Sequence, residues 1–493
     1  MCPRRSLRLA TALVLTAGAQ ASGWDDRRED AVHRELDRAV TPQPGNEHLL
    51  RLSALRALHD ERLVPLLVSL TEDDDPAIQV HALLGLAELA PDGHLEPATL
   101  LQADPIALES ALAVGLETDR LGTEDMQRLL EDSSIRADSR LWLLGALLEA
   151  GAEVAPATVT AVDTSDNPLA AARQSAQLAH LGHAESLRAD TERLLQGTPS
   201  NEQLDAALEA MDQTRRLPSE AGFDLARACL RSSSPDGVRR YALLTLLEQR
   251  ASGAVDLFCE EVAATTRRRH LVDLSLLLLM TNTATPEACR ARLENDELLA
   301  ALSRAAIALA ADPTTALPSL QGLIESGHRR TIAWVLAQSE QWEDRIAVPL
   351  LERILDRSVQ AGLRAPTASH GVRSASLLLE RAPDAFRTRL IQAEDDGIEQ
   401  QVLLLALLQR PAPSLAEAVA SIRRIGVGPA DVLALLVHAR DQEVIAAADV
   451  ANLKLVAASS TASEAVRTQA AWLAVRHSGI VDDVVASLVK LAR

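Results

Sequence analysis

The sequence predicts an all-α protein whose helices are arranged in pairs along one extended array. Hydrophobic residues make up 47% of the 493 residues, yet the aromatic share is only 2%, so the core must be aliphatic. Leu and Ala, combined with Glu, Gln and Arg, are strong helix formers, whereas sheet proteins rely on aromatic and β-branched residues. Apolar residues also recur at helical spacing, and a short arginine signature recurs about every 30 to 34 residues.

The first 21 residues are typical of a signal peptide. Basic residues, including Arg4 and Arg5, precede a short apolar run, and Ala19 and Ala21 are the small residues that signal peptidase accepts. We expect cleavage after Ala21 and export to the periplasm. The arginine pair resembles part of a twin-arginine signal, so this route and the general secretory route both stay open. No apolar run reaches the roughly 18 residues of a membrane-spanning helix, so no membrane span is expected.

A charged lead segment at 22–46 follows the expected cleavage site. We expect a short helix within it. The sequence Thr-Pro-Gln-Pro-Gly then separates this helix from the first helix pair, because proline and glycine interrupt helical patterns. We therefore place the helical array at 47–493.

The clearest unit of the array lies at 62–90. Four leucines share one face of its first helix: Leu63, Leu66, Leu67 and Leu70. An acidic turn follows. The second helix is expected at Ile78–Leu89, because Asp75 can cap it and Pro76 suits its first turn. The unit is thus a helix, a turn and a helix.

The second helix of a unit carries a short signature. A small or apolar residue precedes an arginine, and another stands three positions after it, as in Val238, Arg239 and Ala242. Six arginines occupy this position: Arg140, Arg173, Arg239, Arg330, Arg373 and Arg467. The first two are 33 residues apart, and the second and third are 66 apart, which is twice that interval. Two-helix units of this length are typical of an α-solenoid.

A helix, an acidic turn and a second helix with Val-Arg-x-x-Ala together resemble a HEAT repeat, including the short bacterial kind. The copies near 62–90, 218–250 and 442–477 are the most specific, and about thirteen units fit between about 47 and 480. The resemblance implies a right-handed α-solenoid. It also implies that the six arginines form a ladder, each pairing with an acidic turn residue of a neighbouring repeat. The alternative is an exposed arginine row that binds a ligand on the concave face.

Three cysteines remain after the expected cleavage: Cys229, Cys259 and Cys289. Each lies in an expected first helix, so all three stand at similar heights on consecutive helices. Packed helix axes are about 8–10 Å apart and a disulfide needs Cα atoms within about 7 Å, so only a close crossing permits a bridge. We expect buried free thiols, with a Cys229–Cys259 or a Cys259–Cys289 disulfide as the alternative.

The sequence contains few residues that point to a catalytic or ligand-binding site. It lacks the usual motifs of dinucleotide, phosphate, zinc-peptidase and serine-hydrolase sites, so we expect no cofactor, no metal and no catalytic residue. Ser487–Lys490 matches a four-residue catalytic pattern that arises readily by chance. His180 and His183 are interpreted as the end of a helix rather than as metal ligands. The acidic runs Glu72–Asp75 and Glu394–Asp396 precede helices and lack calcium-loop spacing.

Two features concern the later part of the array. An apolar stripe predicts a final helix that caps the array: Val481, Val484, Val485 and Leu488. The interval between Arg330 and Arg373 is 43 residues, longer than the 30 to 34 residues of one unit. We place the additional residues in a loop at 358–370, where Gly, Pro, Thr and Ser interrupt the helical pattern.

Charge narrows the choice of partner. With 69 acidic and 49 basic residues the net charge is -20, which disfavours nucleic acid as a ligand. The basic cluster Arg267–His270 is interpreted as a solvated helix start. We expect an exported, non-catalytic scaffold or adaptor that binds another protein through an extended surface. The alternative is an accessory or hydrolytic periplasmic enzyme whose active-site residues are dispersed along the chain.

Overall fold

The computed structural model describes most of the chain, and every regular element in the described part is a helix. The described residues are 21–133, 135–196, 198–362, 368–395, 397–422 and 428–492. The predicted all-α class is therefore confirmed. The expected signal peptide lies outside the described residues, apart from Ala21, which begins the first helix.

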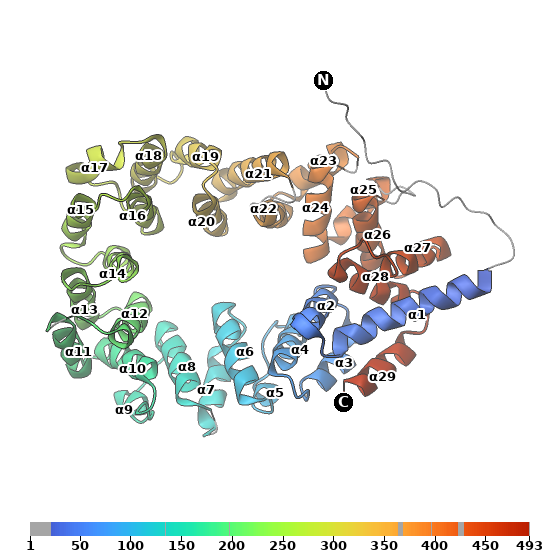
Figure 1. Ribbon diagram of the computed structural model, residues 1–493, viewed down its shortest axis with the longest axis horizontal. Coiled ribbons are helices and arrows are strands. Elements are labelled where there is room, and N and C mark those ends of the chain that lie inside the picture. The colour runs from blue at the N-terminus through green and yellow to red at the C-terminus, as the bar shows by residue number, and fades with distance from the viewer. Residues whose placement is uncertain are drawn as a thin grey trace.

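The helices form two layers around a central opening (Figure 1). Inner helices border the opening, and along most of the chain each contacts the next inner helix. The inner helices are α2 (Glu47–Arg56), α4 (Pro76–Leu89), α6 (Pro105–Glu117), α8 (Ala137–Glu149), α10 (Pro168–His180), α12 (Asn201–Arg216), α14 (Asp236–Glu248), α16 (Arg268–Met280), α20 (Arg329–Ser339), α22 (Ala368–Arg381), α24 (Ile398–Gln409), α26 (Pro429–Asp441) and α28 (Glu464–Arg476).

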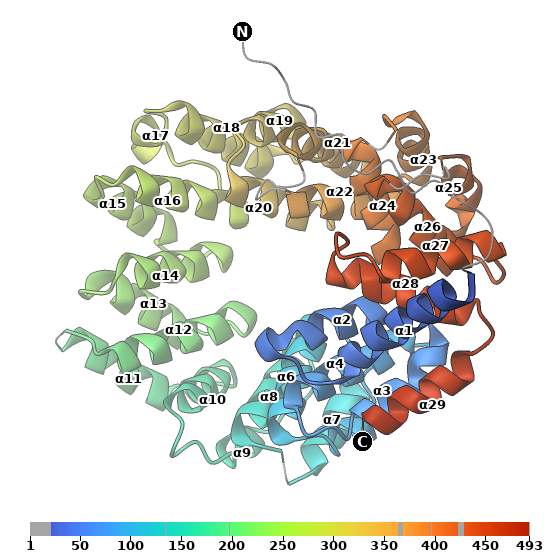
Figure 2. The same cartoon turned by 45° about the vertical axis from the view of Figure 1, so that its right-hand side comes forward.

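The outer layer contains shorter helices as well as long ones. Its helices are α1 (Ala21–Val40), α3 (Val64–Leu70), α5 (Pro97–Leu100), α7 (Thr123–Glu131), α9 (Pro156–Thr160), α11 (Glu185–Leu195), α13 (Glu220–Arg231), α15 (Ala254–Ala264), α17 (Glu287–Leu293), α19 (Leu317–Glu325), α21 (Asp344–Ala361), α23 (Pro383–Gln392), α25 (Ala416–Ile422), α27 (Ala447–Ala457) and α29 (Val481–Leu491). Helix α18 (Glu297–Ala311) departs from the alternation, because Figures 1 and 2 place it beside α17 and α19. Three short 3-10 turns complete the set: η1 (Pro44–Asn46), η2 (Glu61–Leu63) and η3 (Pro413–Leu415).

Local chemistry sets the start of α4, as the sequence predicted. The Asp75 carboxylate accepts a hydrogen bond from the Ala77 backbone N–H at 2.9 Å, and Pro76 is the first residue of the helix. A capping carboxylate satisfies one of the free N–H groups of a first turn, and proline has no N–H to leave unpaired. Helix α4 ends at Leu89, so the expected second helix of this unit is confirmed.

The core between the layers is aliphatic. Most buried hydrophobic residues are Leu, Ala, Val and Ile, and only a few aromatic side chains are fully buried, among them Phe258, Phe386 and Trp472. One of the main core clusters joins residues from both ends of the chain, for example Leu36 and Leu52 with Trp472 and Val484. None of the described helices is long and apolar enough to cross a membrane.

The two ends of the helical array meet, so the array is a closed ring rather than the extended one that we expected from the sequence. Helix α28 packs against α1 and α2, and α27 also contacts α1. The expected capping helix is α29, which packs against α1 and α3 near the start of the chain (Figure 2). We refer to the contacts of α1, α2 and α3 with α27, α28 and α29 as the ring closure.

Buried polar contacts accompany this apolar packing. Arg51 of α2 donates to Glu35 of α1 and to Glu464 of α28, each at 3.0 Å. The side chains of Arg51 and Glu35 are only 3% and 4% exposed. The indole N–H of Trp472 donates to Asp60 at 2.9 Å. The ring closure therefore combines an aliphatic core with charged and polar groups that pair with one another away from water.

The long interval between Arg330 and Arg373 has a different origin from the loop that we expected. Helix α21 continues to Ala361 and is 18 residues long, so it takes up much of the additional length. Gly362, with φ of +87°, then ends the helix in a conformation that favours glycine. Residues 363–367 of the expected loop lie outside the described part.

Candidate functional site

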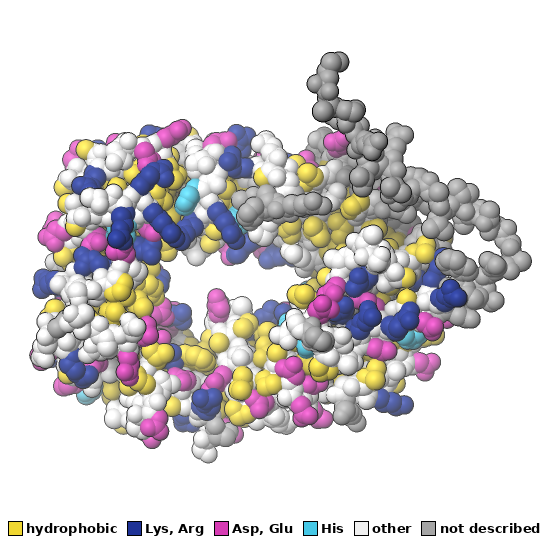
Figure 3. Space-filling view, viewed as in Figure 1, with side chains coloured by type: hydrophobic (Ala, Val, Ile, Leu, Met, Phe, Trp, Pro, Cys, Tyr) yellow, Lys and Arg dark blue, Asp and Glu magenta, His cyan; other side chains and the backbone are white. Residues whose placement is uncertain are grey.

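The inner helices supply a candidate binding surface. The space-filling view shows that the central opening passes between the two sides of the ring (Figure 3). Lys and Arg side chains gather along the edge of the opening that α16, α20 and α22 form, and hydrophobic side chains lie beside them over α14 (Figure 3). This surface is unusual in a chain whose net charge is -20.

Three of the six signature arginines lie in buried or half-buried networks. Arg173 pairs with Asp138 of the preceding inner helix at 3.4 Å and with Glu209 of the following one at 2.8 Å. Arg467 lies 3.5 Å from Glu35, which belongs to the opposite end of the chain. Arg239 pairs with Glu261 and donates to the Leu230 carbonyl. Each of these arginines joins different helices.

The other three signature arginines differ. Arg140 donates to the backbone carbonyls of Asp132 at 2.8 Å and Leu130 at 3.0 Å. Arg330 pairs with Asp273 at 2.6 Å and Arg373 pairs with Glu340 at 2.5 Å, but both guanidinium side chains are more than half exposed. The structure therefore brings Arg330 and Arg373 to an accessible surface. The side chains of Arg173, Arg239 and Arg467 are instead buried or half-buried.

Substitution of Arg239 by alanine should lower the free energy of unfolding by about 2 kcal/mol, the scale of a hydrogen bond to a charged group. Burial acts to raise the pKa of Glu261, but the hydrogen bonds and charges of Arg239 and His270 hold it below its ordinary value. Without Arg239 this buried carboxylate loses its main partner. Chemical denaturation measures the change, and exposed Arg128→Ala is a matched control with little expected effect. Unchanged stability together with lost partner binding would contradict a structural role.

The cysteines lie on three consecutive outer helices, as expected. Cys229 of α13 is fully buried, and burial raises the pKa of its thiol to about 12. Cys259 of α15 and Cys289 of α17 bring their sulfur atoms within 3.1 Å of each other, although all three cysteines are free thiols in this structure. Burial and the neighbouring Cys259 raise the pKa of Cys289 to about 12. Two disulfides were possible from the sequence, Cys229–Cys259 and Cys259–Cys289. The structure brings the sulfur atoms into contact only for Cys259 and Cys289.

Treatment with diamide should join Cys259 and Cys289. The two thiols lose two protons and two electrons to diamide as the S–S bond forms, and the reaction should quicken at higher pH because the thiolate is the attacking species. Peptide mapping by mass spectrometry identifies the product. Cys229→Ser should leave it unchanged, whereas Cys259→Ser should abolish it. A crosslink to Cys229 in the native protein would contradict the prediction.

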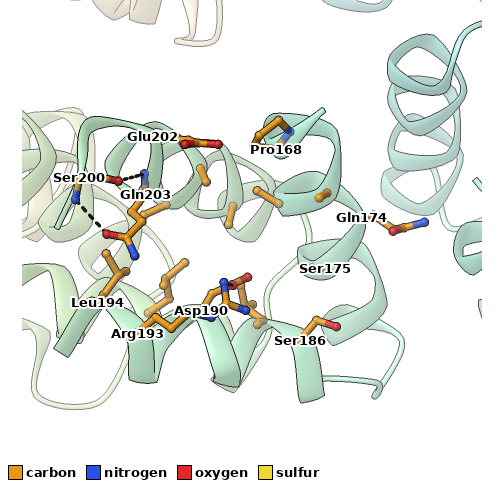
Figure 4. Close-up of a pocket in the computed structure, with 17 residues that line it drawn as sticks. Pro168, Gln174, Ser175, Ser186, Asp190, Arg193, Leu194, Ser200, Glu202 and Gln203 are labelled. Carbon is orange, nitrogen blue, oxygen red and sulfur yellow. Dashed lines mark hydrogen bonds and ion pairs between the residues drawn. The ribbon is translucent and has the colours of Figure 1, made fainter. Parts of the chain in front are cut away.

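Two cavities contain polar side chains, and several of these have structural partners. One, of about 750 Å³, lies between α10, α11, α12 and α13 (Figure 4). In it Asp190 pairs with Arg193 at 2.9 Å, and Ser200 and Gln203 cap α12 by exchanging hydrogen bonds. Burial raises the pKa of Asp190, although Arg193 opposes the shift. These residues give no nucleophile with an adjacent base.

The second cavity, of about 1140 Å³, lies beside α16, α18 and α19. Its Asp296 accepts from the Leu299 backbone N–H at 2.9 Å, which caps α18, and also pairs with Arg268 at 2.7 Å. Within the described residues no group of three or more His, Cys, Asp or Glu side chains could hold a metal ion. His180, which we had interpreted as a helix end, contacts the Pro218 carbonyl at 3.1 Å.

The ring closure supplies residues that sequence reasoning missed. Glu35, Arg51, Asp60 and Trp472 belong to no recurrent signature, and Glu35 falls in the charged lead segment. Their partners lie more than 400 residues away along the chain. Comparison of the sequence with protein-family models and with curated proteins finds no match.

Proposed function

We propose that this protein is a non-catalytic scaffold that binds another protein on the inner helices of a closed α-solenoid. The regular pairing of helices and the arginine signature support a right-handed solenoid of about thirteen HEAT-like repeats. Stacked helix pairs present a large curved surface, and such surfaces are suited to protein partners.

The ring closure is the observation that carries the proposal. Buried ion pairs and shared core residues hold the first and last helices together, so the inner surface has a fixed curvature before any partner arrives. A surface that is already ordered loses less conformational entropy on binding than a flexible one. The structural use of the polar groups in both cavities further favours a binding role over a catalytic one.

Export belongs to the same proposal. The basic residues, the apolar run and the small residues at Ala19 and Ala21 support secretion to the periplasm. Sequencing the N-terminus of the protein purified from its native cells tests this directly. The expected first residue is Ser22, and a protein that retains Arg4 and Arg5 would contradict it.

A photo-crosslinking amino acid tests the binding surface. We would place it at exposed Gln409 of inner helix α24 and, as a matched control, at exposed Glu260 of outer helix α15. Crosslinking in native cells should capture a discrete protein from the inner position only. Opening of the ring by Arg51→Ala should abolish this capture. Capture from Glu260 alone, or from neither position, would overturn the proposal.

A further inference from the structure

A small groove lies on the inner side of the ring between α14, α16 and α20. It has a volume of about 270 Å³, and its apolar lining includes Tyr241, Leu244, Leu277, Met280 and Trp334. Met280 is 48% exposed, which is high for a large apolar side chain. The groove is somewhat smaller than typical small-molecule pockets of roughly 300–1,000 Å³. It therefore suits one large side chain better than an enclosed substrate.

The groove lies where α18 is absent from the row of inner helices, although α18 still packs against α16. Because α18 lies with α17 and α19, no residue of α18 lines the space between α16 and α20 (Figure 1). Arg330 of α20 instead reaches Asp273 of α16, and Arg240 of α14 pairs with the other oxygen of the same carboxylate. The Asp273 carboxylate thus forms ion pairs with two arginines. The rim of the groove therefore keeps an excess of positive charge.

Further arginines stand on α16, α20 and α22, the same inner helices, and we call the set the inner basic stretch: Arg240, Arg268, Arg269, Arg329, Arg330 and Arg373. Arg269 and Arg329 are exposed and have no ion pair within the described part of the chain. Burial lowers the pKa of His370, and the charges of Arg329 and Arg373 lower it further. Both arginines therefore lie near the His370 imidazole. The inner basic stretch therefore extends from α14 to α22.

We propose that this groove and the inner basic stretch bind an acidic peptide segment of a partner protein, with one large apolar side chain of that segment seated in the groove. The inference rests on the proposed function and specifies its partner. Charge complementarity selects the occupant. Arg269 and Arg329 have no ion pair in the described part of the chain, and Arg240 and Arg330 share one carboxylate, so the surface keeps a net positive charge that attracts carboxylates. Tyr241 and Trp334 supply aromatic surface of the kind that anchors interfaces.

A nucleic acid fits this surface less well than an acidic peptide. A duplex carries one charge per roughly 1.7 Å over its whole length, whereas most of this chain repels anions. A short acidic segment needs only the six arginines between α14 and α22. Its apolar residue also makes use of the groove, which a phosphate backbone would leave empty.

Fluorescence anisotropy with the full chain tests the proposal. The probe is a labelled peptide of Asp and Glu with one central Phe, and two matched peptides replace either the acids or the Phe by Ser. Each matched peptide should bind roughly tenfold more weakly or worse. Arg329→Glu and Met280→Asp should weaken the first peptide by a similar factor, and added salt should weaken it further. Arg188→Glu, on exposed outer helix α11, should leave its affinity unchanged.

Several outcomes would overturn the inference. If the uncharged Phe peptide binds as tightly as the acidic one, charge does not contribute to recognition. If Arg329→Glu weakens binding no more than Arg188→Glu does, the peptide does not bind at this surface. Stronger competition by a DNA duplex than by unlabelled peptide would favour nucleic acid. If the acidic peptide fails to bind while Gln409 still captures a protein, this inference is wrong and the scaffold proposal stands.

Discussion

Replacing Arg51 with alanine should lower the free energy of unfolding by about 3–5 kcal/mol, the usual effect of removing one partner of a buried ion pair. The guanidinium of Arg51 holds Glu35 and Glu464, which belong to opposite ends of the chain. Without it, Glu35 remains in the interior near the more distant guanidinium groups of Arg38 and Arg467 and the Thr468 hydroxyl. Chemical denaturation measures the loss of stability. Small-angle X-ray scattering should show a larger radius of gyration, because the ring opens.

Arg38→Ala is the matched control for this experiment. Arg38 also lies near Glu35, at 3.6 Å, but its side chain is 52% exposed, so its removal should change stability by less than about 1 kcal/mol. The double variant Glu35→Ala/Arg51→Ala should regain part of the stability, because no isolated charge then remains buried. If Arg51→Ala behaves like Arg38→Ala in both measurements, the ion pair does not hold the ring closed.

Substitution of Trp472 by alanine should lower the free energy of unfolding by about 3–5 kcal/mol through a different mechanism. Trp472 of α28 is fully buried in the core cluster that joins the two ends. Its loss leaves a cavity that the surrounding helices fill only in part, and it also removes the hydrogen bond to Asp60. Chemical denaturation again measures the loss.

Trp342→Ala provides a comparison away from the ring closure. Trp342 is only half-buried and contacts Trp334 edge-on, with ring centroids 5.8 Å apart. Its substitution should therefore destabilise the protein less than that of Trp472 and should leave the radius of gyration unchanged. Equal losses of stability in the two variants would contradict the assigned role of Trp472.

The parts of the fold that the sequence predicts well are those determined by neighbouring residues. Asp75 and Pro76 predict the start of α4, because a capping carboxylate and a first-turn proline act within two residues of each other. The apolar stripe from Val481 to Leu488 likewise predicts α29. In these segments local propensity and hydrophobic periodicity agree, so tertiary contacts are not needed to place the helix.

The ring closure could not be predicted in this way. Arg467 carries a recognisable local signature, but its partner Glu35 is more than 400 residues distant and stands in a stretch of ordinary surface charges. Nothing local distinguishes Glu35 from the exposed acids around it. Its burial depends on helices that the chain reaches only at its other end.

The candidate site illustrates a similar division. The sequence indicates Arg330 as a member of a regular series, and it shows the cluster Arg267–His270 as basic. It does not indicate that α18 lies beside α17 and α19, or that Arg330 of α20 reaches Asp273 of α16. A break in the packing of a regular array depends on side-chain volumes in several helices at once, so a periodic pattern does not reveal it.

The position of α29 against α1 and α3 limits how the length of this protein could change during evolution. An open array can gain or lose one helix pair, since only the neighbours of that pair must adapt. In a closed array the same deletion would shift Trp472 and Glu464 away from Asp60 and Arg51. The number of helix pairs is therefore tied to the curvature of each one, and duplication or loss of a single pair should be far less tolerated than substitutions within it.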